Sequence, residues 1–134
     1  MNQFGFCSFS FEQFKQFRQR YPELSPEDFE RALPLIDQAM APLAQAHMAR
    51  PDAVLIDQEF EFTARLMRHA CRCGLLALGA VEDGAGTRQE LADDLQEIIA
   101  TYEEIWLKRN RPGGLEDSVA RLRQPLDDYQ ERVS

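Results

Sequence analysis

Residues 91–122, LADDLQEIIATYEEIWLKRNRPGGLEDSVARL, contain two helical patterns joined by a glycine-rich turn. The segment 112–114, Pro-Gly-Gly, allows the chain to reverse within a few residues, because glycine adopts positive φ angles easily. A second apolar pattern starts directly after this turn. The stretch therefore predicts two antiparallel helices. Apolar side chains recur at three- and four-residue steps, the spacing of one helix face, at Leu91, Leu95, Ile98, Ile99, Tyr102, Ile105 and Trp106 and then at Leu115, Val119, Leu122, Leu126 and Tyr129.

An earlier helix is expected from Ser25 onward. A serine followed by proline and two acidic residues is typical of a helix start. Pro34 and Pro42 lie inside the apolar pattern, and each removes one backbone donor. We therefore expect one long bent helix, with two short helices as the alternative. The apolar face of this segment consists of Phe29, Leu33, Ile36, Met40, Leu43 and Met48.

The next helix is expected to begin at Asp52, which can act as its cap, and to end near Gly79. Thr87 and Glu90 have the spacing of a capping box, so we expect them to open the following helix. Pro125 is expected to interrupt the last helix near its end. The helix after Asp52 has an apolar face that includes one acid, made of Leu55, Ile56, Glu59, Phe62, Leu66, Met67, Ala70, Cys73 and Ala77.

These patterns predict an all-α protein, an antiparallel helical bundle of about four helices with kinked members. The 134 residues fit a single domain, with an aromatic-rich N-terminal segment over residues 1–24 and the bundle over residues 25–130. That N-terminal segment is expected to pack over the domain's own core, or alternatively to dock onto another domain or subunit. Its aromatic residues are Phe4, Phe6, Phe9, Phe11, Phe14 and Phe17.

The overall charge argues against two classes of partner. Lys and Arg total 15 and Asp and Glu total 23, which gives a net charge of −8. A nucleic-acid binder needs a basic face, and an anionic membrane surface would repel an acidic protein. The first residues lack the basic and long apolar regions of a signal peptide, so we expect a cytoplasmic protein with reduced thiols.

The residue types that carry chemistry do not form a recognisable active site. Cys71 and Cys73 would point about 200° apart on a helix, so we expect small buried cysteines and no metal site. Glu59 is interpreted as a partly buried acid paired with an arginine. His47 and His69 are interpreted as solvated or hydrogen-bonded histidines. No catalytic residue and no cofactor are therefore predicted.

The turn after Trp106 carries a distinctive string, W-x-x-R-N-R-P-G-G-L-x-x-S. This string resembles the end of bacterial β-N-acetylhexosaminidase-like proteins of glycoside hydrolase family 20, where an all-helical region follows the catalytic barrel. Residues 66–74 are also similar to that region. The resemblance covers roughly residues 25–129 and is specific at the turn.

The resemblance implies a C-terminal accessory domain without catalytic residues of its own. Catalysis in the family is substrate-assisted and uses an Asp-Glu dipeptide in the barrel, and in this sequence no aspartate is followed directly by a glutamate. The expected partner is a glycosidase catalytic barrel or a second subunit, including a homodimer. The alternatives are a stand-alone interaction or dimerisation module and, thirdly, a small bundle enzyme or carbohydrate-binding module. The candidate contact residues, called the corner below, are Trp106, Arg109, Asn110, Arg111, Pro112, Gly113, Gly114 and Leu115.

Overall fold

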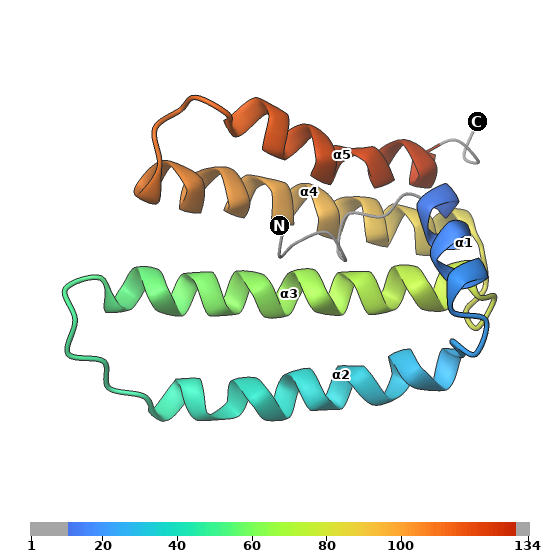
Figure 1. Ribbon diagram of the computed structural model, residues 1–134, viewed down its shortest axis with the longest axis horizontal. Helices are drawn as coiled ribbons and strands as arrows, with labels where there is room; N and C mark the ends of the chain where they lie inside the picture. The colour runs from blue at the N-terminus through green and yellow to red at the C-terminus, as the bar shows by residue number, and fades with distance from the viewer. Residues whose placement is uncertain (1–10, 131–134) are drawn as a thin grey trace.

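The computed structural model describes residues 11–130, and these residues form an all-α structure, as the sequence predicts. Helices α2, α3, α4 and α5 lie side by side in chain order, each antiparallel to the one before, and α1 lies across one end (Figure 1). Within residues 11–130, no helix is both long and apolar enough to cross a membrane. The elements are α1 Phe11–Arg20, α2 Pro26–Met40, the 3-10 helix η1 Ala41–Gln45, α3 Ala53–Ala77, α4 Ala85–Arg109 and α5 Leu115–Gln130.

The two prolines near α2 act differently. Ser25 is the N-cap of α2, as predicted, and its backbone N–H donates to the Asp28 carboxylate at 2.9 Å. The helix continues through Pro34 and ends at Met40. Pro42 lies in the 3-10 helix that follows, so the expectation of one bent α-helix through both prolines is wrong for the second. A proline near the end of a helix supplies no N–H to extend the ladder, and the chain tightens instead into a 3-10 turn.

Two other predicted boundaries differ from the structure. Helix α4 begins at Ala85, because the N–H of Arg88 already donates to the carbonyl of Gly84 at 3.1 Å. Thr87 therefore lies inside the first turn and is not the cap. Helix α5 continues through Pro125 to its end at Gln130. The predicted limits of α3 are confirmed, since Asp52 occupies the N-cap position and Gly79 follows with φ of +75°, but the Asp52 side chain makes no capping hydrogen bond.

The core consists of two clusters on different sides of α3. Cys73 belongs to the larger cluster and Cys71 to the smaller one, as expected for helix positions about 200° apart. The smaller cluster joins α2 to α3 through Ile36, Ala64 and Cys71. The larger cluster joins α3, α4 and α5 and contains Phe62, Leu66, Cys73, Leu76, Leu91, Ala92, Leu95, Ile98, Ile99, Val119, Leu122 and Tyr129.

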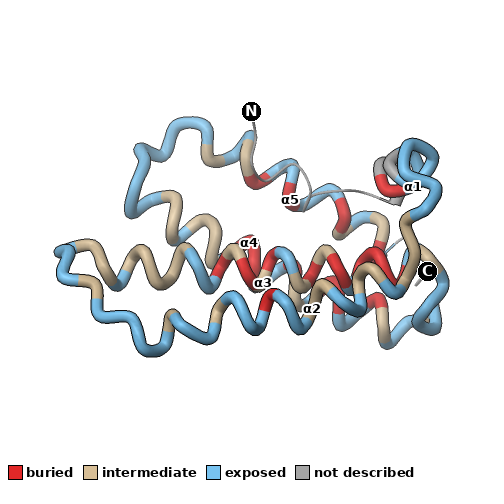
Figure 2. Tube along the Cα trace, turned by 60° about the horizontal axis from the view of Figure 1, so that its bottom comes forward, coloured by how far each residue is buried: buried red, intermediate tan, exposed pale blue. Residues whose placement is uncertain are grey.

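Burial is uneven along the bundle. Buried residues gather in the part of the bundle nearer to α1, whereas the opposite end is intermediate or exposed (Figure 2). Residues 50–61 and 100–118 form that opposite end and include no buried residue. In the N-terminal segment, Phe14 is buried and its ring lies 6.0 Å from that of Phe29, consistent with packing on the domain's own core. The other five phenylalanine side chains of that segment lie outside the part that the structure describes.

Candidate interaction site at the α4–α5 corner

The corner is a defined turn that contains its own hydrogen bonds. The backbone N–H of Asn110 donates to the carbonyl of Trp106 at 2.7 Å and ends α4. The indole Nε1 of Trp106 donates to the carbonyl of Arg111 at 3.1 Å. Gly114 has φ of +86°, a conformation that favours glycine. Trp106 lies against Gly114, and Leu115 then starts α5. The turn is therefore set by the tryptophan and the second glycine.

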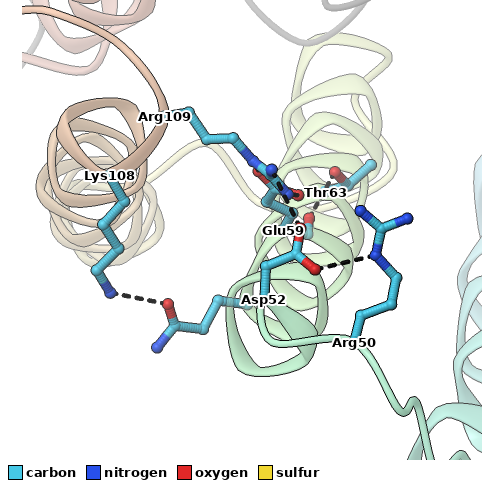
Figure 3. Close-up of polar contacts among 7 residues, drawn as sticks. Arg50, Asp52, Glu59, Thr63, Lys108 and Arg109 are labelled. Atoms are coloured by element: carbon cyan, nitrogen blue, oxygen red, sulfur yellow. Dashed lines mark hydrogen bonds and ion pairs between the residues drawn. The ribbon is translucent and has the colours of Figure 1, made fainter.

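Arg109 connects the corner to the beginning of α3. Its Nε and Nη2 atoms donate to the two oxygens of Glu59 at 2.6 and 2.9 Å (Figure 3). Its Nη1 lies 3.4 Å from Asp52, which also accepts a hydrogen bond from Arg50 at 3.0 Å. The hydrogen bonds from Arg109 lower the pKa of Glu59, and those to Glu59 raise the pKa of Arg109. The prediction that Glu59 pairs with an arginine is confirmed.

Lys108 adds a second connection between the same two helices. Its Nζ donates to Gln58 at 2.9 Å, the dashed line drawn from Lys108 in Figure 3, and to Glu104 at 3.1 Å. Side chains this exposed gain little stability from one ion pair, because water screens the charges. Their joint effect is geometric, since two adjacent basic residues fix the end of α4 against the beginning of α3. We call this set of contacts the Arg109–Glu59 clamp.

The remaining corner residues, 110–113, lie at the surface. Residues 110–113 are exposed, and the Arg111 guanidinium makes no hydrogen bond or ion pair with residues 11–130. Large apolar side chains at this end of the bundle are also exposed, by 71% for Val54, 52% for Phe60 and 52% for Leu107. Of the two predicted arginines, Arg109 therefore holds the corner to α3, and Arg111 is available for contact with a partner.

A second polar group lies inside the bundle, where His69 is hydrogen-bonded as expected, although the sequence did not identify its partners. His69 is only 2% exposed, and its Nδ1 lies 2.9 Å from an oxygen of Asp94. Its Nε2 lies 3.0 Å from the hydroxyl of Tyr129. The other oxygen of Asp94 accepts a hydrogen bond from Arg65 at 2.8 Å. Hydrogen bonds from His69 and then Arg65 lower the pKa of Asp94 to about 2.

This buried network is built to hold helices together. Both ring nitrogens of His69 have partners, so neither is available to a substrate. Burial raises the pKa of the neighbouring Cys73 thiol, which keeps it protonated and poorly nucleophilic. Among residues 11–130, no three His, Cys, Asp or Glu side chains are grouped so that they could hold a metal ion. One sequence signal was present, because His69 lies three residues after Leu66 and four before Cys73 on the core face.

Comparisons of the chain with protein families, with curated proteins and with solved structures found no match. The resemblance to glycoside hydrolase family 20 therefore depends on the corner string and residues 66–74. The geometry adds that the corner string encodes a compact turn held by Trp106 and Gly114.

Proposed function

We propose that this chain is a non-catalytic helical accessory domain of a β-N-acetylhexosaminidase-like glycoside hydrolase, and that its corner end docks onto the catalytic barrel. The main support is the contrast between the two ends of the bundle. The end near α1 contains the buried core, whereas the corner end contains no buried residue and exposes Val54, Phe60 and Leu107. These are three of the seven exposed large apolar side chains among the described residues, and at this end no buried residue accompanies them, which is typical of a contact surface.

The clamp supports the same proposal through its rigidity. Docking costs less free energy when the contact surface is already ordered before binding. The Arg109–Glu59 clamp and the Trp106 hydrogen bond order the corner within this chain. Arg111 and Leu107 then lie on a fixed surface, with a guanidinium for a partner carboxylate and an apolar side chain for burial. Burial of each apolar side chain contributes about 25 cal/mol per Å².

The proposal can be tested with surface variants that leave the fold intact. The partner is the family 20 barrel encoded in the same reading frame or genome, produced separately and titrated with the chain by calorimetry. The double variant Leu107→Ser with Arg111→Glu changes two exposed positions at the corner. The matched control is Arg18→Glu, an exposed arginine on α1 at the other end of the bundle.

We expect binding by the wild type and the control and a loss of affinity of about tenfold or more in the double variant, roughly 1.4 kcal/mol or more. Light scattering of the isolated chain tests the alternative, a dimerisation module unrelated to sugars. A dimer that the double variant dissociates, together with no binding to the barrel, would replace the proposal with that alternative. A monomer that binds no barrel would refute both.

A further inference from the structure

A pocket of about 570 Å³ lies at the end of the bundle near α1, away from the corner. It is bordered by α2, α3 and α5, with α1 and Leu24 at one side. Its walls include the buried side chains of Phe14 and Ile36 and the ring of Phe29. Leu35 and Met67, which are 61% and 44% exposed, also line it. Protein interiors rarely leave so large a space between packed helices.

The order of helix packing explains why the space exists. Helix α2 packs on α3, and α5 packs on α4, so α2 and α5 approach α3 from different sides. The strip of α3 between them contains Met67 and Ala70, whereas Gly74, one turn further along the same face, is covered by the ring of Phe29. Ala70 is too small to fill the gap, and α2 contributes another alanine, Ala32, to the lining.

The polar residues that line the pocket are already paired. His69 and Tyr129 bond to each other, and the other nitrogen of His69 bonds to Asp94. Asp28 accepts hydrogen bonds from Ser25 and Arg31 and is the single carboxylate among the described residues of the lining. No lysine or arginine belongs to the described lining. A hydrocarbon could therefore enter without leaving a polar group unpaired, whereas an anion would find no positive charge there.

We propose that this pocket is a binding site for a neutral small molecule that consists mainly of hydrocarbon, such as an esterified acyl chain or a fused-ring compound. The volume falls within the range of about 300–1,000 Å³ that small-molecule pockets occupy. Occupancy would cover Leu35 and Met67, and it would join α2 to α5 across the open strip of α3. The proposal is independent of the corner, so either can fail alone.

The neutral fluorescent probe N-phenyl-1-naphthylamine tests this site by titration into the full chain. Ala70→Trp places a large side chain in the pocket, and Ala100→Trp places the same side chain at an exposed position of α4 as a matched control. We expect saturable binding to the wild type and to the control, with a Kd about tenfold or more higher for Ala70→Trp. Leu35→Asp changes an exposed position at the pocket and should weaken binding without a need to repack the core.

Several results would overturn the proposal. One is the absence of saturable binding to the wild type, and another is equal affinity in the wild type, Ala70→Trp and Leu35→Asp. If the anionic probe 8-anilinonaphthalene-1-sulfonate binds as tightly and responds to the same variants, the proposed neutral ligand class is wrong. If only a chain that starts at residue 11 binds the neutral probe, residues 1–10 compete for the pocket and the ligand proposal fails. Circular dichroism of each variant shows whether it is folded. If Ala70→Trp is not folded, Leu35→Asp still tests the proposal.

Discussion

Replacing Tyr129 with phenylalanine removes one oxygen from the centre of the bundle and keeps the ring. The Tyr129 hydroxyl lies 3.0 Å from Nε2 of His69, and the two residues are 1% and 2% exposed. After the change, Nε2 is buried without this partner and water has little access to it. A typical hydrogen bond contributes about 1 kcal/mol net, and a buried polar group left unpaired costs about 1–3 kcal/mol. No cavity forms beyond the volume of the oxygen, so we expect the free energy of unfolding to fall by about 1–3 kcal/mol.

Urea denaturation followed by far-UV circular dichroism at pH 7 measures this change. The control is Tyr102→Phe, because Tyr102 is half-buried and its hydroxyl makes no hydrogen bond with residues 11–130. We expect the control to change the free energy of unfolding by less than about 0.5 kcal/mol. Equal losses in the two variants would refute the reasoning, since the cost would then come from removing any tyrosine hydroxyl and not from the buried pair.

Three further changes test the acid, the turn and the core. The pKa of Asp94 is lowered from 3.8 to about 2 in the folded chain, so its carboxylate stabilises the fold above about pH 4, by on the order of 2 kcal/mol, and this contribution is lost as the pH falls towards 2. Urea titrations should therefore show that Asp94→Asn is less stable than the wild type at pH 7 and that this difference in the free energy of unfolding narrows below pH 4. A difference that does not change with pH would contradict the stabilising role of the Asp94 carboxylate. Gly114→Ala should lower the free energy of unfolding by about 1 kcal/mol because φ is +86°, whereas Gly113→Ala should be nearly neutral. Thermal melts compare the two variants, and identical Tm values would show that the positive φ is unimportant. Ile98→Ala should lower the free energy of unfolding by about 2–5 kcal/mol because Ile98 is 0% exposed, and the control Leu107→Ala should lower it by less than about 0.5 kcal/mol. Urea denaturation measures both variants, and a small effect at Ile98 would refute its place in the core.

The helices were predictable because local patterns determine them. The apolar spacing between Leu91 and Trp106 predicted α4, and the Pro-Gly-Gly segment predicted the reversal into α5. The errors occurred where a local signal competes with packing. Thr87 has the spacing of a cap, yet the chain already becomes helical at Ala85. Pro125 is buried in α5, where its packing against the bundle outweighs its missing N–H.

The candidate sites depended more on long-range contacts. The sequence predicted that Glu59 pairs with an arginine, but it could not choose Arg109, which lies 50 residues away. The His69 network joins residues 25 and 60 positions apart, and no local pattern encodes such separations. The pocket could not be predicted at all, because it results from the different directions from which α2 and α5 approach α3.

The last turn of α5 has a consequence for the order of assembly during synthesis. Tyr129 supplies a partner to His69 on α3, and the carbonyl of Asp128 supplies one to Arg88 on α4. The two residues of each contact are 60 and 40 positions apart in the chain. His69 and Arg88 therefore leave the ribosome before Tyr129 and Asp128, their partners on α5. Until then, Nε2 of His69 and Nη1 of Arg88 keep water as their partner, although Asp94 and Asp83 can already accept hydrogen bonds from the other nitrogens of these two side chains. The part of the bundle around His69 and Arg88 therefore excludes water only after the last turn of α5 has been synthesised.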